Sequence, residues 1–351
     1  MRILVAGDKA PADVPRLLSR AFEQLGHAVS VFYLNQPSWE DRWGWRLRRF
    51  PGRFRRIGDA LREQYLRSVN NRWLDWVLEV KPDIVVVING VQLLPEAVSR
   101  TRETLRIPVV NWVLDDPSRA QEARFLEAYP LYQTLFTCCP AWLEFAKFWG
   151  CHVAYLPLAI DPDVYTPLED IRKLGTTGYD TDVVFVGTIL ANDPSSYFRA
   201  SMAAALARQG HKISLYARGA RHFVPLLSGL GDATIVEEMP STEDVNKIYN
   251  RAKIVLNMHN IFNQHVVALR VFEAAAAGAF QLTTHQDELA PLFPGGLIQT
   301  YRSQGELTSK VRRFLAQPDE RNRLGTEAAL HVRGHHTYRH RAKEILETAL
   351  S

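Results

Sequence analysis

Short runs of β-branched and other apolar residues alternate along the chain with stretches in which apolar residues recur every three or four positions. The run at residues 83–89, DIVVVIN, is apolar almost throughout, as a strand covered on both faces of a sheet must be. Strands separated by helices are joined by right-handed crossovers and pair in parallel. This alternation predicts an α/β protein built on parallel sheets.

The alternation occurs twice, on either side of a segment rich in Pro, Gly and Thr at residues 157–181, a composition typical of a linker between domains. With 351 residues the chain is long enough for two domains. We therefore expect two Rossmann-like, doubly wound domains facing a central cleft, where such sheets bind ligands. The expected strands lie at residues 3–6, 28–34, 83–89, 107–114, 134–139 and 152–157, and then at 182–188, 212–217, 233–239, 252–259 and 279–284.

The composition suits a globular, intracellular protein. Hydrophobic residues make up 46% of the chain and charged residues 23%, which is enough to bury a core. The apolar run at residues 3–6 is too short for a signal peptide, and no stretch is long enough to span a bilayer. The three cysteines are too few and unevenly placed for a disulfide framework or a metal site. We expect a cytoplasmic protein without a bound metal.

Residues 257–284, NMHNIFNQHVVALRVFEAAAAGAFQLTT, combine a strand end, a polar turn and a helix that is predicted to run from His265 to Gly278. A helix N-terminus presents free N–H groups and suits a pyrophosphate. Arg270 and Glu273 are three residues apart and share a helix face. The carboxylate can accept hydrogen bonds from ribose hydroxyls and the guanidinium can neutralise phosphate. The alternative is a surface ion pair of little energetic weight.

Several segments carry a resemblance to a known family. In the C-terminal half they are YNRAKIVLNMHN, LRVFEAAAAGAFQLTT, ELAPLFPGG and HHTYRHRAKEIL; the N-terminal half adds KPDIVVVING, IPVVNWVLDDP and YLPLAIDPDVYTP. In this order they cover most of the chain, which resembles the CgeB-like (spore-maturation-protein-type) glycosyltransferases of the GT-B superfamily. The resemblance implies metal-independent, retaining transfer from a UDP- or GDP-linked sugar, with no further cofactor.

From the linker composition we expect an acceptor-side domain at residues 1–163, a linker at 164–181, a donor-side domain at 182–334 and a helix at 335–351. The resemblance implies that this helix crosses back to the first domain, and it also implies donor-site roles. Glu273 matches the second glutamate of the family's E-x7-E signature, which holds the ribose. His265 stands where the first glutamate would contact the donor sugar, and this departure leaves the sugar and the stereochemical course open.

Further donor-side candidates end the strands of the second set. Gly187 lets the backbone approach a phosphate or sugar, with Thr188 beside it, although a plain turn explains both equally well. Relatives carry an Arg-Lys pair after this strand; here we expect Arg218 and Arg270 to replace it. Two more candidates follow later strands: Met239, whose backbone would read the base, and Asn260.

Asp115 and Asp116 end a strand of the first set, where side chains face the ligand site of a doubly wound sheet. Either carboxylate can accept the acceptor's hydroxyl proton or orient the donor sugar. A metal-binding pair is the weaker alternative, because adjacent residues on a strand point in opposite directions. Asp116 can instead cap a following helix that begins at Pro117, which favours Asp115 as the catalytic residue.

Residues 39–56, from Trp39 to Arg56, hold seven arginines interleaved with five aromatic residues. Trp39, Trp43, Leu47 and Phe50 fall at helical spacing until Pro51 and Gly52 break the run. A basic amphipathic helix suits an anionic membrane surface, a lipid-phosphate acceptor or nucleic acid. The alternative is a helix packed on its own domain with a solvated basic face.

We therefore expect a glycosyltransferase that contacts the inner face of the membrane peripherally through residues 39–56. The sequence does not identify its acceptor and leaves a glycan, a lipid-linked sugar, a protein and a small molecule open. Two alternatives stay open, because a fold does not fix a function. One is a sugar-nucleotide epimerase or hydrolase on the same scaffold. The other is an inactive protein that binds a nucleotide sugar or a polyanion.

Overall fold

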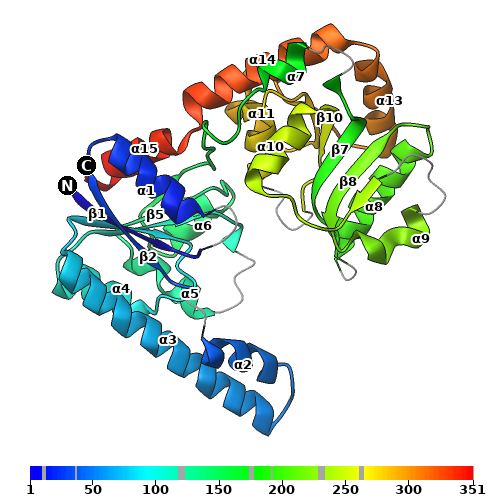
Figure 1. Cartoon of the computed structure of the whole chain (residues 1–351). Helices are drawn as coiled ribbons and strands as arrows, with labels where there is room; N and C mark the ends of the chain where they lie inside the picture. The colour runs from blue at the N-terminus through cyan, green and yellow to red at the C-terminus, as the bar shows by residue number, and fades with distance from the viewer. Residues whose placement is uncertain are drawn as a thin grey trace. The chain divides into compact units, whose positions relative to one another are not determined.

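A computed structural model describes residues 1–9, 13–35, 38–117, 123–173, 178–190, 193–227, 234–260 and 265–350. The chain divides into two compact units, an N-terminal unit of Met1–Pro157 with Tyr338–Ser351 and a C-terminal unit of Leu158–Thr337 (Figure 1). The division falls at Pro157, a few residues before the boundary that we expected after residue 163, and residues 164–181 group with the C-terminal unit. No helix among the described residues is both long enough and apolar enough to span a bilayer.

The N-terminal unit contains a six-stranded parallel sheet in the order β2-β1-β3-β4-β5-β6. Its central strands β3 and β4 are buried along their whole length, as their β-branched sequences predict. The strands are β1 (Arg2–Gly7), β2 (Ala28–Tyr33), β3 (Ile84–Ile88), β4 (Val109–Val113), β5 (Thr134–Thr137) and β6 (Val153–Tyr155). The helices are α1 (Val14–Gln24), α2 (Trp39–Leu47), α3 (Arg53–Val80), α4 (Pro95–Ser99), α5 (Ala123–Glu127), α6 (Trp142–Phe148) and α15 (Tyr338–Leu350).

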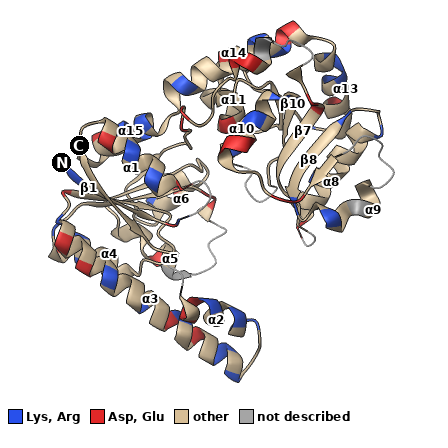
Figure 2. Cartoon of the chain, in the orientation of Figure 1, with Lys and Arg blue, Asp and Glu red and all other residues tan. Residues whose placement is uncertain are grey.

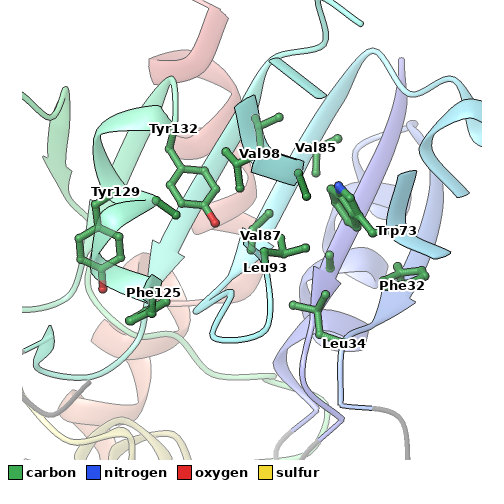
Figure 3. Packing of buried hydrophobic residues seen from close by; sticks show 14 of the residues in the cluster. Phe32, Leu34, Trp73, Val85, Val87, Leu93, Val98, Phe125, Tyr129 and Tyr132 are labelled. Carbon is green, nitrogen blue, oxygen red and sulfur yellow. The ribbon is translucent and has the colours of Figure 1, made fainter. Parts of the chain in front are cut away.

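One hydrophobic cluster of the N-terminal unit joins this sheet to the C-terminal part of α3, to α4 and to residues 125–132 (Figure 3). Apolar residues along one side of α3 are buried there, among them Tyr65, Val69, Trp73 and Val77. The Trp73 ring packs edge-on against Phe32 at 5.6 Å between centroids, and its Nε1 donates to Thr101 Oγ1 at 3.2 Å. The buried indole therefore has both an aromatic neighbour and a hydrogen-bond acceptor, as stable burial requires.

The C-terminal helix α15 belongs to the N-terminal unit and contacts α1. Arg341 is buried, and its Nε donates to the Pro157 carbonyl at 2.7 Å while its Nη1 pairs with Glu344 at 2.7 Å. Tyr338 packs edge-on against Trp112. These contacts fix the last helix beside the end of the first unit's sheet.

The C-terminal unit contains a second six-stranded parallel sheet, in the order β12-β11-β10-β7-β8-β9. Successive strands are added outward in opposite directions from the central pair β7 and β10, so the strand order reverses between these two strands. The strands are β7 (Thr181–Thr188), β8 (Ile213–Arg218), β9 (Thr234–Val236), β10 (Ala252–Asn257), β11 (Gln281–Thr284) and β12 (Gln299–Tyr301). The helices are α7 (Glu169–Lys173), α8 (Pro194–Ala207), α9 (Val224–Leu227), α10 (Thr242–Asn250), α11 (Leu269–Ala276), α12 (Leu289–Leu292), α13 (Gln304–Leu315) and α14 (Pro318–His335).

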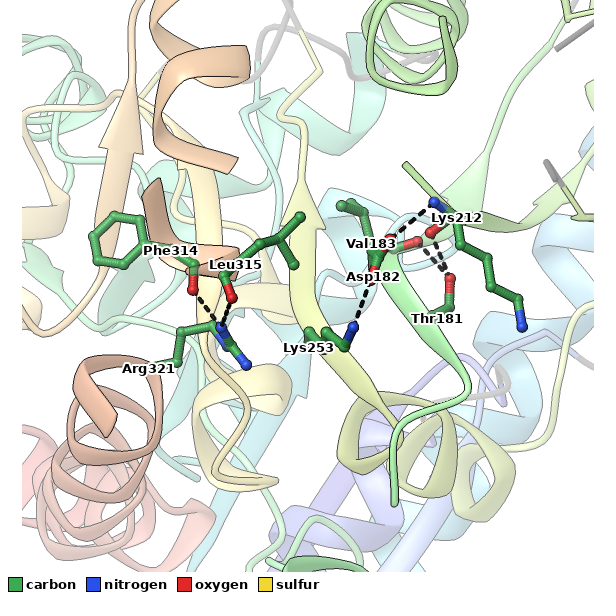
Figure 4. Close-up of polar contacts among 8 residues, drawn as sticks. All are labelled: Thr181, Asp182, Val183, Lys212, Lys253, Phe314, Leu315 and Arg321. Atoms are coloured by element: carbon green, nitrogen blue, oxygen red, sulfur yellow. Dashed lines mark hydrogen bonds and ion pairs between the residues drawn. The ribbon is translucent and has the colours of Figure 1, made fainter. Parts of the chain in front are cut away.

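Polar contacts tie together the amino ends of the strands in this second sheet (Figure 4). Asp182 on β7 accepts from Lys253 Nζ of β10 at 2.8 Å and from the backbone N–H of Lys212 at 3.0 Å. Thr181 Oγ1 donates to the Lys212 carbonyl at 2.8 Å. The edge opposite the expected ligand site is thus fixed by contacts within the protein.

Candidate functional site

The carboxyl ends of β7 and β10 lie side by side where the strand order reverses, which is the position at which open parallel sheets bind ligands. Gly187 and Thr188 end β7, and Thr188 is in register with Arg218 at the end of β8. A Cβ on Gly187 would lie 2.7 Å from the ring of Phe185, so the glycine leaves room for that ring. Three predicted donor-side residues therefore lie on adjacent strand ends, with Arg218 exposed.

Arg199 on α8 joins these strand ends and was not among the residues that the sequence predicted. Its Nη1 donates to the Thr188 carbonyl at 2.9 Å and its Nε donates to the Met258 carbonyl at 3.1 Å, so one guanidinium spans β7 and β10. One helical turn earlier, Ser195 Oγ donates to Asn260 Oδ1 at 2.8 Å. Arg199 is the only basic residue between β7 and the middle of α8, and it was missed because we looked for an Arg-Lys pair.

The helix predicted to begin at His265 begins instead at Leu269 and ends at Ala276. His265 lies in a turn before the helix, and the prediction of its helical position was wrong. The intervening Val266 and Val267 are β-branched and buried, which disfavours the helical backbone and favours packing into the core. His265 and the free N–H groups at the start of α11 are consequently separate features.

Arg270 and Glu273 form a partly buried ion pair on α11, in which Glu273 is buried, so the pair is not the surface ion pair of the alternative. Arg270 Nη1 lies 2.8 Å from Glu273 Oε2, and the two side chains are 33% and 6% exposed. Tyr165 lies beside them, and its pKa is raised by burial, by the charge of Glu273 and by a hydrogen bond with that carboxylate. Burial lowers the pKa of Arg270, but Tyr249 and Glu273 more than offset this effect and raise it overall. The guanidinium therefore stays charged.

A pocket of about 380 Å³ opens at the carboxyl ends of β10 and β11. It brings together two of the predicted donor-side residues, Asn260 and His265. His265 Nδ1 lies 2.8 Å from Glu288 Oε1. The residues lining the pocket are Phe198, His259, Asn260, His265, Thr284, His285, Gln286, Asp287, Glu288 and Arg302.

The polar groups of the pocket suit a hydroxyl-rich ligand. Burial, followed by the charge of Arg199, lowers the pKa of His259 to about 4, so its imidazole is neutral at neutral pH. The carboxylate of Glu288 accepts hydrogen bonds and Arg302 donates them. Within the described ranges, no group of three or more His, Cys, Asp or Glu side chains is placed to hold a metal ion.

The remaining candidates lie elsewhere. Met239 follows β9, is half-buried and does not line the pocket. Asp115 and Asp116 follow β4 in the N-terminal unit. Asp116 Oδ1 accepts from Trp142 Nε1 at 2.9 Å, and Asp115 is exposed. The helix that Asp116 was expected to cap falls on residues 118–122, outside the described residues.

Comparison with known proteins links this fold to glycosyl transfer. Residues 199–347, from Arg199 in α8 into α15, match a family described as glycosyl transferase-like. No curated protein matches the chain by sequence.

The whole chain is similar to solved structures of low sequence identity. Sucrose-phosphate synthase from Thermosynechococcus elongatus superposes with a TM-score of 0.72 at 14% identity, over 99% of this chain and 98% of that one. The UDP-forming α,α-trehalose-phosphate synthase from Burkholderia vietnamiensis gives 0.72 at 11% identity, over 100% of both chains. Anabaena HepE in complex with UDP and glucose gives 0.64 at 13% identity, over 100% of both. The chain therefore has the GT-B fold.

Proposed function

We propose that this protein is a glycosyltransferase that takes a sugar from a UDP- or GDP-linked donor bound to the C-terminal unit. The observation that carries the proposal is the pocket at the carboxyl ends of β10 and β11, whose lining residues apart from Phe198 lie within the segment that matches the glycosyl transferase-like family. The UDP in the HepE structure supports a uridine nucleotide as the first donor to test. The CgeB-like subfamily remains part of the proposal.

The donor's parts are assigned to separate groups on the second sheet. Glu273 holds the ribose hydroxyls, because the carboxylate can still accept hydrogen bonds besides those from Arg270 and Tyr165. The diphosphate is bound by Gly187, Thr188 and Arg218, together with the free N–H groups of the first turn of α11. The Met239 backbone reads the base.

The sugar occupies the pocket beside Asn260 and His265. This chain has His265 in place of the first glutamate of the family signature, and Glu288 supplies the carboxylate there, with its Oε1 2.8 Å from His265 Nδ1.

The acceptor side is assigned to the N-terminal unit, with Asp115 as the group that receives the acceptor's proton. The acceptor oxygen bonds C1 on the same face that the diphosphate leaves: the bond from C1 to the β-phosphate oxygen breaks, the bond to the acceptor oxygen forms, and the acceptor hydroxyl proton passes to the Asp115 carboxylate. Arg218 and the α11 N–H groups stabilise the departing diphosphate without a metal. We propose transfer with retention at C1.

The test measures thermal stabilisation by nucleoside diphosphates and by the corresponding nucleotide sugars. We expect one base to stabilise the protein, and Glu288→Gln to weaken binding of the nucleotide sugar about tenfold while sparing the diphosphate. Glu243→Gln, an exposed carboxylate on α10, is the matched control.

Stabilisation by no nucleotide contradicts the proposal. Consumption of the donor without any acceptor, at the rate seen with acceptors present, supports the epimerase or hydrolase alternative instead. Equal loss of diphosphate and nucleotide-sugar binding in Glu288→Gln would overturn the assignment of the pocket to the sugar.

A further inference from the structure

A helical hairpin in the N-terminal unit, made of α2 and the first turns of α3 (residues 39–57, the basic hairpin), packs little against the rest of its unit. The 28 residues of α3 form a helix about 42 Å long, but the helix first contributes to the hydrophobic core at Tyr65. Figure 1 shows α2 lying against this end of α3, away from the sheet. The hairpin is therefore supported mainly by its own two helices.

The basic hairpin is nevertheless fixed in shape. The helices approach closely at two glycines, since a Cβ on Gly58 would lie 2.8 Å from the Gly44 carbonyl oxygen. Arg62, whose side chain is buried, pairs with Asp41 at 2.6 Å across the two helices. Its guanidinium also lies 5.2 Å from the centroid of the Trp45 ring. These contacts make the hairpin a rigid platform.

The outer surface of this platform exposes large apolar side chains. The alternative of a helix packed on its own domain does not fit these side chains: Trp39, Trp43 and Phe50 are exposed, and Gly44 is the residue of α2 that is buried. The cause is the close glycine contact, which turns the large side chains outward. Of the 15 exposed large hydrophobic side chains among the described residues, six belong to the hairpin: Trp39 (59%), Trp43 (47%), Trp45 (37%), Phe50 (57%), Phe54 (57%) and Ile57 (41%).

The basic hairpin also carries a concentration of positive charge (Figure 2). Residues 39–56 contain seven of the 42 basic residues and two of the 38 acidic ones, a net charge of +5, whereas the whole chain has +4. Arg48 pairs with Asp59 at 3.0 Å. Within the described part of the chain, the other arginines of this segment form no ion pair: Arg42, Arg46, Arg49, Arg53, Arg55 and Arg56.

We propose that the basic hairpin docks the protein on an anionic lipid surface. Aromatic side chains are stable at the boundary between headgroups and acyl chains, and arginines beside them reach the lipid phosphates. Each arginine near an anionic surface strengthens binding about fivefold. Nucleic acid would satisfy the arginines but leave most of the indole and phenyl surface in water, because phosphate contacts dominate such interfaces. This inference does not depend on the transferase proposal.

The test uses the full chain and flotation with vesicles of phosphatidylcholine, alone or mixed with phosphatidylglycerol. We expect binding to the mixed vesicles only, weakened by salt because the attraction is partly electrostatic. The triple variant Arg49→Gln, Arg53→Gln, Arg56→Gln should bind on the order of 100-fold more weakly. Trp39→Ser with Phe50→Ser should also weaken binding, since both rings would insert.

Two control variants test whether binding depends on the basic hairpin or on any exposed arginine or aromatic side chain. Arg208→Gln with Arg312→Gln removes exposed arginines elsewhere, and Phe148→Ser removes an aromatic side chain that is 92% exposed on another helix. Both should bind like the wild type, and all variants should keep the wild-type unfolding midpoint. Equal binding to neutral and mixed vesicles, full binding by the triple variant, or tighter binding to a DNA duplex than to the vesicles would each overturn the proposal.

Discussion

Replacing Glu273 by alanine should destabilise the C-terminal unit even when no substrate is present. The carboxylate is 6% exposed and lies 2.8 Å from Arg270, so its removal leaves a largely buried guanidinium without its partner. Breaking a buried ion pair by removing one partner costs about 3–5 kcal/mol. Because the Arg270 side chain keeps 33% of its exposure, we expect the lower end of this range, about 3 kcal/mol.

The loss is measured by urea and thermal unfolding of Glu273→Ala beside the wild type. For a unit of this size, 1 kcal/mol shifts the midpoint by about 2–4 °C, so the expected fall is roughly 6–12 °C. The matched double variant Arg270→Met, Glu273→Leu removes both charges and should recover most of this loss. Wild-type stability for Glu273→Ala, within about 0.5 kcal/mol, would refute the reasoning that this pair is buried and coupled.

This stability effect decides how the ribose assignment is tested. Donor affinity is best measured on Glu273→Gln, which keeps the shape of the side chain and one acceptor oxygen. The measurement is made at a temperature well below the unfolding midpoint of this variant. Loss of a charged acceptor for the ribose should weaken donor binding by about 1.5–3 kcal/mol. Unchanged affinity in Glu273→Gln would show that the carboxylate serves only the ion pair.

Three further outcomes follow from other parts of the C-terminal unit. The pKa of His259, about 4 when folded, lies below its unfolded value, so protonation of this group should lower the free energy of unfolding by roughly 3 kcal/mol as the pH falls from about 6.5 to about 4, with no effect above pH 7. Urea unfolding of the wild type and His259→Gln over this pH range measures the effect. Equal slopes of unfolding free energy against pH in the two proteins would contradict it. Arg199→Met should raise the pKa of His259, as followed by NMR, because it removes a nearby positive charge; an unmoved pKa would count against that coupling. Gly325→Ala should destabilise the protein by about 1–3 kcal/mol, because a Cβ there would lie 2.3 Å from the Gly278 carbonyl oxygen. Gly334→Ala on the same helix has open space around it and should stabilise the protein by about 0.5–1 kcal/mol. Calorimetry that gives Gly325→Ala the higher unfolding midpoint of the two would contradict the packing of α14.

The strands were predictable where long apolar runs lie in the middle of a sheet, because burial on both faces leaves a clear mark in the sequence. The strand β12 (Gln299–Tyr301) was missed because three residues with two polar side chains leave no such mark. The start of α11 was misplaced at His265, since the pattern does not show that Val266 and Val267 turn into the core.

The candidate site was predictable in its parts but not in its contacts. Arg270 and Glu273 stand out by their spacing, yet their burial beside Tyr165 depends on a segment distant in the chain. The role of Arg199 depends on two carbonyl groups at strand ends, and main-chain acceptors leave no trace in side-chain patterns. Glu288 reaches His265 only through folding.

The central claim is that a nucleotide-sugar donor binds at the carboxyl end of the second sheet. Hydrogen exchange read by mass spectrometry, with and without the nucleotide that stabilises the protein, tests this claim most directly, because it reports protection along the backbone. The account predicts slower exchange at residues 184–190 and 265–276 when the nucleotide is bound. Protection confined to the N-terminal unit, or equal exchange with and without the nucleotide at these residues, would contradict it.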